Sequence, residues 1–226
     1  MQTLLPDPTT VLPAAWLQGM DAEAMAASLQ LRGWCVVDLA LPARLAEQLR
    51  RACTEQMAAR FRPAGIGRQD GYQLRRQVRS DEICWLDGSN PAVAEYLTCM
   101  EHLRSALNRV LFLGLFEYEC HFARYTPGAY YRLHRDAFAD QPSRLLSSVL
   151  YLNQHWRPEQ GGELVLYADA AQTLVETVLP CHNRLVLFLS AQFPHEVKPA
   201  TRMRYSLTGW FRNAREQPLI AVPPLP

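Results

Sequence analysis

The sequence has no excess of charge of one sign and no long apolar run. Its 226 residues carry 23 Lys and Arg against 22 Asp and Glu, which gives a formal net charge of +1. This balance does not favour a role driven by a broad electric field on nucleic acid or on an anionic membrane. No window approaches the roughly 18 uncharged apolar residues that a membrane-spanning helix needs. We therefore expect no nucleic-acid partner and no membrane partner, and a partner that is selected by a local site.

Two further absences concern the compartment and the fold. The six cysteines lie far apart without a C-x-x-C pair, and the start MQTLLPDP lacks a basic segment followed by an apolar one. We therefore expect reduced thiols and a cytoplasmic protein. The sequence also lacks a G-x-G-x-x-G or Walker loop. Since no helices are predicted between the strands of the second half, a doubly wound nucleotide-binding fold is excluded.

The composition is that of an ordinary globular chain, with 49% hydrophobic and 20% charged residues. The length suits one domain of 200 or more residues. We expect a single domain over 1–226, mainly β with supporting helices (α+β). Its predicted parts are an N-terminal extension at 1–20, helical support at 21–112 with a substrate loop at 62–87, a β-rich core at 113–213 and a Pro-rich tail at 214–226.

The first half is predicted to be mainly helical. Asp21 is typical of a helix N-cap, and Gly33 is typical of a helix end. Residues 62–80 are rich in Gly and Arg and are interpreted as a mobile loop or an exposed hairpin. Helices are expected at 22–31, 42–57 and about 91–111, with one strand at 34–39.

Short strands dominate the second half. Turn sequences such as Pro127-Gly128 and Gly161-Gly162 separate them. Six or more such strands imply a sandwich or a small barrel. The predicted strands are 116–125, 145–152, 163–167, 173–179, 185–189 and 204–211.

Three residues have the pattern of a metal site. His134 and Asp136 form an H-x-D pair, and residues i and i+2 of an extended chain point to the same side. This pair alone is a weak signal, but His195 starts a later strand, and two His with one carboxylate form the facial triad of non-haem Fe(II) oxygenases. The alternative is that each residue is an ordinary polar side chain in a turn. The other histidines are interpreted as structural: His102, His121, His155 and His182.

The predicted strand at 204–211 adds a second signal, because Arg204, Ser206, Thr208 and Trp210 share one face of it. If that face lines a barrel interior, Arg204 is a buried cation that requires an anion. A dicarboxylate ligand would supply the anion, and Tyr151 could donate a hydrogen bond to the same group. Exposure of Arg204 to solvent is the alternative, and Arg202 is the competing cation.

Several motifs together carry a family resemblance. They are Y-T-P-G-A-Y-Y-R-L-H-R-D (125–136), Y-L-N (151–153), G-G-E-L (161–164), R-L-V-L-F-L-S (184–190), P-H-E-V-K-P-A (194–200) and R-Y-S-L-T-G-W-F (204–211). This set resembles the catalytic core of the 2-oxoglutarate- and Fe(II)-dependent prolyl 4-hydroxylase-like family. An arginine nine positions after the distal histidine is the spacing which that family uses for its co-substrate. The segment R-S-D-E-I-C-W-L-D (79–87) is similar to one in the hypoxia-sensing-type prolyl hydroxylases and their bacterial relatives.

The resemblance implies a double-stranded β-helix, or jelly roll, in which iron is held by His134, Asp136 and His195. It further implies that Arg204 binds the distal carboxylate of 2-oxoglutarate. The rest of the co-substrate pocket is then formed by Tyr151, Tyr125 and Thr208. The substrate-facing residues that it implies are Arg79, Asp81, Trp85, Tyr131 and Trp210.

The implied activity is hydroxylation of a C–H bond with O2, in which 2-oxoglutarate is converted to succinate and CO2. Fe(II), 2-oxoglutarate and O2 are the implied cofactor and co-substrates, and ascorbate is a candidate stimulant. The resemblance favours a prolyl residue of a protein as substrate, with a translation elongation factor as a candidate and a monomer as the favoured state. Arg75, Arg76 and Arg79 suit a lid over an acidic peptide, or else belong to a solvated loop.

Two other classes of function stay open. An oxygenase of a free amino acid or another small molecule would use the same iron site, and a closed pocket beside Trp85 would favour it. A non-catalytic jelly roll that senses a ligand or a metal would explain the strands. It would not explain why H-x-D, the distal histidine and the arginine occur together.

Overall fold

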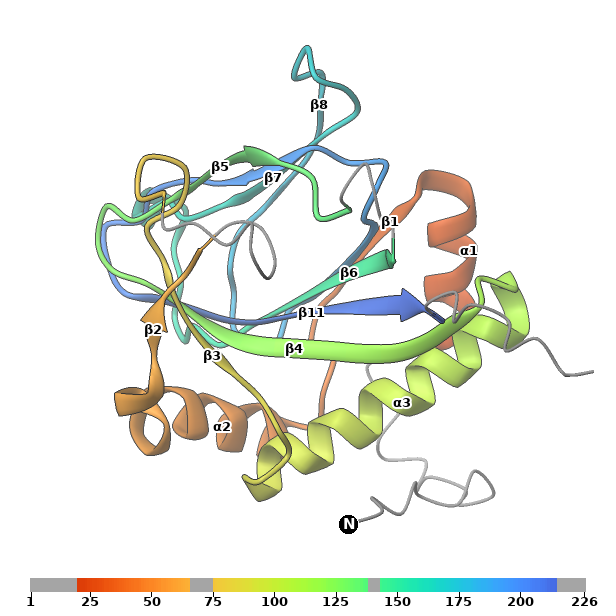
Figure 1. Ribbon diagram of the computed structural model, residues 1–226, viewed down its shortest axis with the longest axis horizontal. Helices are drawn as coiled ribbons and strands as arrows, with labels where there is room; N and C mark the ends of the chain where they lie inside the picture. The colour runs from red at the N-terminus through yellow and green to blue at the C-terminus, as the bar shows by residue number, and fades with distance from the viewer. Residues whose placement is uncertain (1–19, 66–74, 138–142, 215–226) are drawn as a thin grey trace, which may run out of the picture.

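Two antiparallel β-sheets, backed on one side by helices, form the part of the computed structural model that is described, residues 20–65, 75–137 and 143–214 (Figure 1). The larger sheet has the order β1-β9-β6-β11-β4-β3-β2, and the smaller has the order β5-β10-β7-β8. This is the predicted jelly-roll core. The strands of the larger sheet are β1 (Trp34–Val37), β2 (Arg62–Pro63), β3 (Glu82–Trp85), β4 (Leu115–Tyr125), β6 (Arg144–Tyr151), β9 (Leu185–Leu189) and β11 (Arg204–Asn213). Those of the smaller sheet are β5 (Tyr131–His134), β7 (Leu164–Tyr167), β8 (Leu174–Val178) and β10 (His195–Val197).

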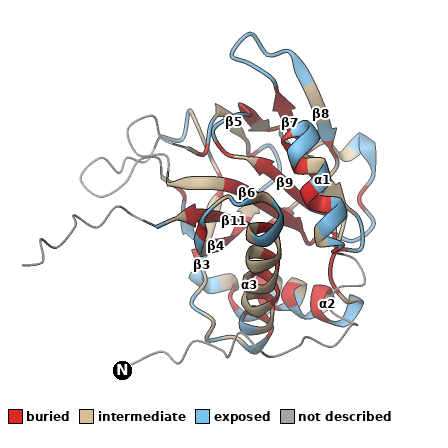
Figure 2. Cartoon of the chain, turned by 90° about the vertical axis from the view of Figure 1, so that its right-hand side faces the viewer, coloured by how far each residue is buried: buried red, intermediate tan, exposed pale blue. Residues whose placement is uncertain are grey.

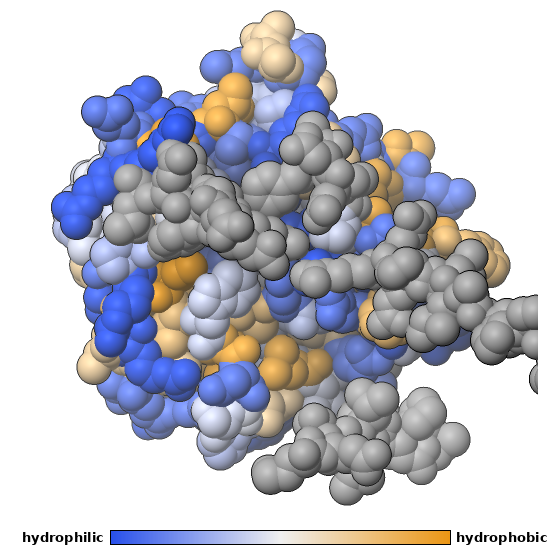
Figure 3. Space-filling model, viewed as in Figure 1, coloured by the Kyte–Doolittle hydropathy of each residue, from blue (hydrophilic) through white to orange (hydrophobic). Residues whose placement is uncertain are grey.

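The helices cover one face of the larger sheet. They are α1 (Ala22–Arg32), α2 (Ala43–Arg51) and α3 (Pro91–Leu111), and α3 runs along the larger sheet next to β4 in Figure 1. Figure 2 shows buried residues along the strands and exposed residues on the outer turns of α1 and α2. None of the helices in the described ranges is both long and apolar enough to cross a membrane. The face seen in Figure 3 is largely hydrophilic, with hydrophobic residues in separate patches.

Capping residues define the helix ends much as predicted. The Asp21 carboxylate accepts hydrogen bonds from the backbone N–H groups of Glu23 and Ala24 at 3.0 and 3.1 Å, and Gly33 ends α1 with a φ of 79°. The helix predicted at 42–57 is shorter than expected. Regular α-helix ends at Arg51, and a π-helical turn follows over Ala52–Gln56 because the backbone hydrogen bonds widen there.

The segment 62–87, predicted as a loop, is partly sheet. Within its described residues, β2 pairs with β3, and β3 pairs with β4 in register Cys84↔Phe122 and Trp85↔His121. Alternation along β3 buries Cys84 and leaves Trp85 half exposed. The loop prediction was therefore wrong for β3, because pairing with β4 stabilises a strand whose flanks read as turns. The part of this prediction that falls on residues 66–74 lies outside the described residues.

Strand alternation divides the interior into two apolar clusters. On one side of the larger sheet, Leu207 and Phe211 of β11 pack against residues of all three helices. On the other side, Tyr125, Tyr151 and Val197 belong to a smaller cluster between the two sheets. The predicted alternation of β11 is confirmed, since its other face lines a cavity between the sheets. This arrangement places the polar face of β11 opposite β5 and β10.

Candidate active site

Three potential metal ligands converge where β5 and β10 lie side by side. His134 ends β5, Asp136 follows two residues later, and His195 begins β10 directly opposite His134 in the strand register. The potential ligand atoms of the three side chains lie within 4.8 Å of one another. His134 Nε2 is 3.7 Å from Asp136 Oδ1, and His195 Nε2 is 3.5 Å from Asp136 Oδ2. The structure thus brings together the three residues that the sequence selected.

Backbone carbonyls orient both imidazoles. His134 Nδ1 lies 2.7 Å from the carbonyl oxygen of Arg132, and His195 Nδ1 lies 3.0 Å from that of Phe193. Because a carbonyl oxygen only accepts, each Nδ1 carries the proton and donates it. Each Nε2 points toward Asp136 and is the nitrogen available to a metal, which is the arrangement that metal-binding histidines adopt.

The protonation states also suit a divalent cation. Burial, followed by the neighbouring His195, lowers the pKa of His134 to about 3, so its imidazole is neutral near pH 7. Burial by itself would raise the pKa of Asp136. The two imidazoles, followed by the Trp210 indole N–H and a hydrogen bond from Ser147, outweigh burial and hold that pKa below its usual range. Two imidazoles and one carboxylate are the donor set of a non-haem Fe(II) site, so the residues fit that metal.

A buried cation without a carboxylate partner lies in the same cavity. Arg204 is 1% exposed, and its Nε donates to the carbonyl oxygen of Gly162 at 2.8 Å. Among the described residues no carboxylate lies within ion-pair distance of its guanidinium. The rings of Tyr125 and Tyr151 flank it, with its Cζ 4.8 and 5.1 Å from their centroids. Since an uncompensated buried charge is costly, this end of the cavity is built for an anion.

Tyr151 supplies a hydroxyl beside that cation. The residue is fully buried on β6, and its hydroxyl has no hydrogen-bond partner among the described residues. Burial raises its pKa to about 12, with Arg204 acting in the opposite direction, so the hydroxyl stays protonated and can donate. A carboxylate placed here could accept from both Tyr151 and Arg204.

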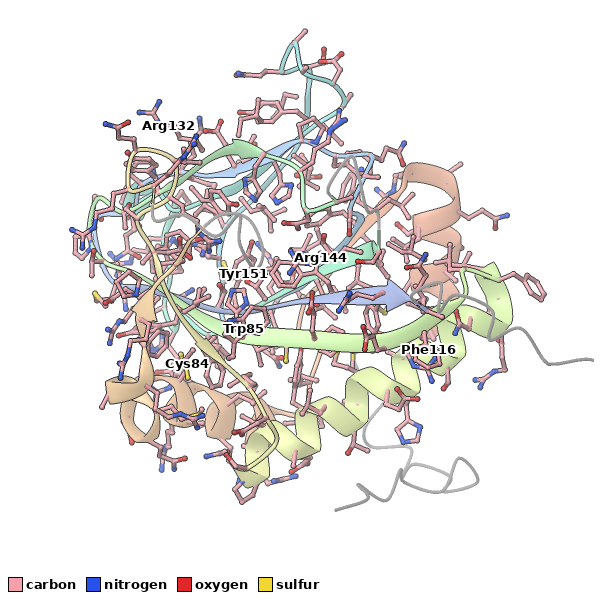
Figure 4. All side chains as sticks on the ribbon, viewed as in Figure 1. Cys84, Trp85, Phe116, Arg132, Arg144 and Tyr151 are labelled. Carbon is pink, nitrogen blue, oxygen red and sulfur yellow. The ribbon has the colours of Figure 1, made fainter. Side chains whose placement is uncertain are left out.

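The cavity has a volume of about 450 Å³ and is lined by both sheets. Thr208 and Trp210 of β11 line it, as the alternation predicts. In Figure 4, Trp85 of β3 and Arg144 and Tyr151 from opposite ends of β6 lie around the space between the sheets, whereas Arg132 lies at the outer edge of the smaller sheet. The lining of the cavity includes all three potential metal ligands together with Arg204, Tyr125, Tyr131, Trp85, Arg79 and Val149.

The predicted substrate-facing residues are not all equivalent. Arg79 donates to both carboxylate oxygens of Asp81 at 2.8 and 2.6 Å, and its guanidinium lies over the ring of Tyr131 at 4.3 Å. Asp81 is 2% exposed and does not line the cavity. Tyr131 in turn stacks on the metal-ligand candidate His134, with ring centroids 3.4 Å apart. Arg79 is therefore neutralised by Asp81 and supports the wall rather than presenting a free cation.

Sequence reasoning missed part of the wall. His121 was interpreted as structural, yet it is buried against Trp85 and Trp210, lines the cavity and has a Nδ1 without a partner among the described residues. Burial, and then the charges of Arg79 and Arg144, lower the pKa of His121 to about 3. The signal that could have revealed it is its strand parity, because His121 and Tyr125 share one face of β4.

Arg144 was also missed. Its guanidinium lies 3.5 Å from the ring centroid of Trp210, and its Nε donates to Glu119 at 2.9 Å. Both charged residues line the cavity. Arg144 is the first residue of β6, and Glu119 lies within β4. In the sequence each is an ordinary charged residue of a strand, so neither gives a signal of a site.

The comparisons with known proteins agree with this site. The family model of the 2OG-Fe(II) oxygenase superfamily matches residues 120–212. Together with the 42% identical relative described next, this match shows that the chain belongs to that superfamily. A prolyl-4-hydroxylase structure from Pseudomonas putida is 42% identical with a TM-score of 0.77, covering 86% of this chain and 100% of that one. These matches identify the branch as the prolyl 4-hydroxylase-like family, which confirms the predicted resemblance, fold and cofactor set of Fe(II), 2-oxoglutarate and O2.

Two animal relatives have the same relationship at lower identity. A prolyl hydroxylase from Trichoplax adhaerens, solved with a peptide fragment of the hypoxia-inducible factor oxygen degradation domain, is 28% identical with a TM-score of 0.73, covering 85% of this chain and 89% of that one. Human prolyl hydroxylase EGLN3 is 28% identical over 153 residues, which is 63% of this chain. The match spans 62% of the length of EGLN3.

Proposed function

We propose that this chain is an Fe(II)- and 2-oxoglutarate-dependent protein prolyl hydroxylase. The observation that carries the proposal is that the His134, Asp136 and His195 cluster and the unpaired Arg204 face one cavity. This arrangement supports a metal site and an anion site within the same cavity. The identity of 42% to the Pseudomonas putida prolyl-4-hydroxylase supports the choice of reaction.

His134, Asp136 and His195 are the residues that would hold the iron. When bound, Fe(II) and 2-oxoglutarate supply the oxidising chemistry, in which a substrate C–H bond is hydroxylated with O2 and the oxo acid becomes succinate and CO2. The chain contributes fixed ligand geometry, since the Arg132 and Phe193 carbonyls hold the imidazole rings.

Arg204 and Tyr151 would bind the far carboxylate of 2-oxoglutarate. Arg204 contributes a permanent charge and Tyr151 a neutral donor, and burial of both excludes competing water. Tyr125 packs against the Arg204 guanidinium. Thr208 lines the cavity on the same face of β11 as Arg204. These four residues account for the co-substrate pocket.

Aromatic residues at the mouth support a peptidyl proline as substrate. Trp85 is 50% exposed at the rim of the cavity, so that side of the cavity is accessible from solvent. Trp210 and Tyr131 add aromatic side chains to the cavity lining. Arg79 is compensated by Asp81, so recognition through a free cation at that position is not part of the proposal.

The test is a hydroxylation assay with Fe(II), 2-oxoglutarate and O2 on protein substrates, with a translation elongation factor as the first candidate. We expect a mass increase of one oxygen atom that tandem mass spectrometry locates on a proline, together with succinate release. Asp136→Ala serves as the matched inactive control. Succinate release stimulated by free proline or another small molecule, with no modified protein, would contradict the protein-substrate proposal.

A further inference from the structure

A chain of two buried serines holds the Asp136 carboxylate. Ser147 Oγ lies 2.7 Å from Asp136 Oδ2, and Ser190 Oγ lies 2.8 Å from Ser147 Oγ. Both serines have no solvent exposure. Neither serine is part of the cavity lining.

The chemistry of the Asp136 carboxylate and the two serine hydroxyls determines which atom donates in each of the two hydrogen bonds. An ionised carboxylate only accepts, so the single hydroxyl proton of Ser147 goes to Asp136. Ser190 must then donate its own proton to Ser147 Oγ. Because a hydroxyl that accepts a hydrogen bond becomes a stronger donor, Ser190 strengthens the bond from Ser147 to the carboxylate.

The backbone holds the two serines more firmly than it holds Asp136. Asp136 lies in a bend beyond the end of β5, in the smaller sheet. Ser147 lies within β6 of the larger sheet, where it pairs with Phe188 of β9 and Trp210 of β11. Ser190 follows β9 directly, and its backbone N–H donates to the Leu145 carbonyl at 3.0 Å. The hydrogen bond from Ser147 thus ties a residue in a bend to a central strand of the opposite sheet.

We propose that Ser147, supported by Ser190, is a positioning residue that fixes Oδ2 of Asp136 and so holds the orientation of this carboxylate toward His134 and His195. The inference rests on the proposed function in one respect, since it takes His134, Asp136 and His195 as the metal ligands. Without the serine, the buried carboxylate can rotate, and a rotated carboxylate is a poorer ligand.

The next residue provides a matched control. Ser148 is also fully buried on β6, but its hydroxyl lies on the opposite face of the strand. It is 2.8 Å from the Tyr118 hydroxyl and donates to the Gly209 carbonyl at 3.2 Å. Ser147→Ala and Ser148→Ala therefore remove the same atom from the same strand, and only the first removal reaches the metal ligand.

The experiment is a titration of the metal-free full-length protein with Mn(II), followed by electron paramagnetic resonance, with thermal melting of each variant alongside. We expect Ser147→Ala to bind Mn(II) about 10-fold or more weakly, in the range typical of groups that orient metal ligands. Ser147→Thr keeps the hydroxyl and should bind close to the parent protein. Ser148→Ala should lower the melting temperature without changing the Mn(II) affinity.

Parental Mn(II) affinity in Ser147→Ala would overturn the inference, as would an equal loss in Ser148→Ala, which would indicate a general packing effect. If Ser147→Ala does not fold, Ser190→Ala replaces it, with a smaller loss expected and parental affinity again contradicting the inference. His134→Ala separates the two proposals. If this variant binds Mn(II) as the parent does, the metal site itself is wrong. If it loses Mn(II) and Ser147→Ala does not, only the role of Ser147 fails.

Discussion

The two faces of the larger sheet bury different kinds of side chain. On the helix side, Leu207 and Phe211 of β11 join an apolar cluster with residues of α1, α2 and α3. On the cavity side, Arg204 and Thr208 of the same strand meet the potential metal ligands. One strand therefore supplies both the stability of the core and the chemistry of the site, because its residues alternate between the two faces.

The polar groups of the two faces differ as well. On the helix side, the Tyr118 hydroxyl is hydrogen-bonded to those of Tyr96 and Ser148, and Ser148 donates to the Gly209 carbonyl. Each of these hydroxyls therefore has a partner within the protein. On the cavity side, Tyr151 Oη and His121 Nδ1 have no partner among the described residues. Buried polar groups are normally paired within a protein, so unpaired ones indicate where a ligand or water completes the structure. This contrast distinguishes the binding face from the supporting face.

Removal of a potential metal ligand from the cavity face should have the largest effect on activity. Asp136→Ala should reduce succinate formation to background, because the remaining two imidazoles hold a divalent cation poorly. The melting temperature of the metal-free protein should show that the variant remains folded. Turnover at the parental rate in this variant would remove the metal assignment.

A truncation on the helix face should lower the stability of the protein and leave its metal affinity unchanged. Leu207 is fully buried, so Leu207→Ala is expected to cost about 2–5 kcal/mol of unfolding free energy, measured by urea denaturation. The Mn(II) affinity of the folded variant should match that of the parent protein. A large loss of affinity would show that the two faces are not independent.

Arg204 and its neighbour Arg202 sharpen the assignment of the anion site. Arg204→Ala should raise the KM for 2-oxoglutarate by roughly 30-fold, which corresponds to about 2 kcal/mol for a lost charge-assisted hydrogen bond. Arg202 is exposed and lies over the ring of Trp156, so Arg202→Ala should leave this KM unchanged. If the effects are reversed, Arg202 is the carboxylate ligand.

The pH dependence of stability should report the buried histidine of the cavity face. The folded pKa of His121 is about 3, below its ordinary 6.5, so between these values the unfolded chain binds a proton that the folded chain does not. Stability should therefore fall as the pH drops through this window, by at most about 1.4 kcal/mol per pH unit for one group. His121→Phe should reduce the slope in urea denaturation of the metal-free protein between pH 7 and pH 5, and His134, whose pKa is also lowered to about 3, should contribute to the slope that remains. An unchanged slope in His121→Phe would contradict the assignment.

Residue spacing predicted the parts of the site that depend on local geometry. The i and i+2 relation of His134 and Asp136 and the alternation along β11 are properties of an extended chain, and both hold in the structure. Tyr151, proposed as a hydrogen-bond donor to the same ligand as Arg204, lies beside Arg204 in the structure.

What the sequence could not predict depends on which strands become neighbours. His121 lacks an acidic partner in the sequence. Its parity with Tyr125 gives the face of β4 on which it lies, and the pairing of β4 with β3 and β11 places that face in the cavity. Asp81 was predicted to face the substrate, but the fold turns it toward Arg79 and away from the cavity. Ser147 is an ordinary strand residue in the sequence, and only the meeting of the two sheets brings it to Asp136.

The central claim is that one cavity holds iron through the triad and 2-oxoglutarate through Arg204. The direct measurement is the visible absorption spectrum of the protein mixed anaerobically with Fe(II) and 2-oxoglutarate. The account predicts a weak visible band that requires both additions, disappears in Asp136→Ala and needs more 2-oxoglutarate in Arg204→Ala. A parent protein that shows no such band, or a band that survives in Asp136→Ala, would contradict it.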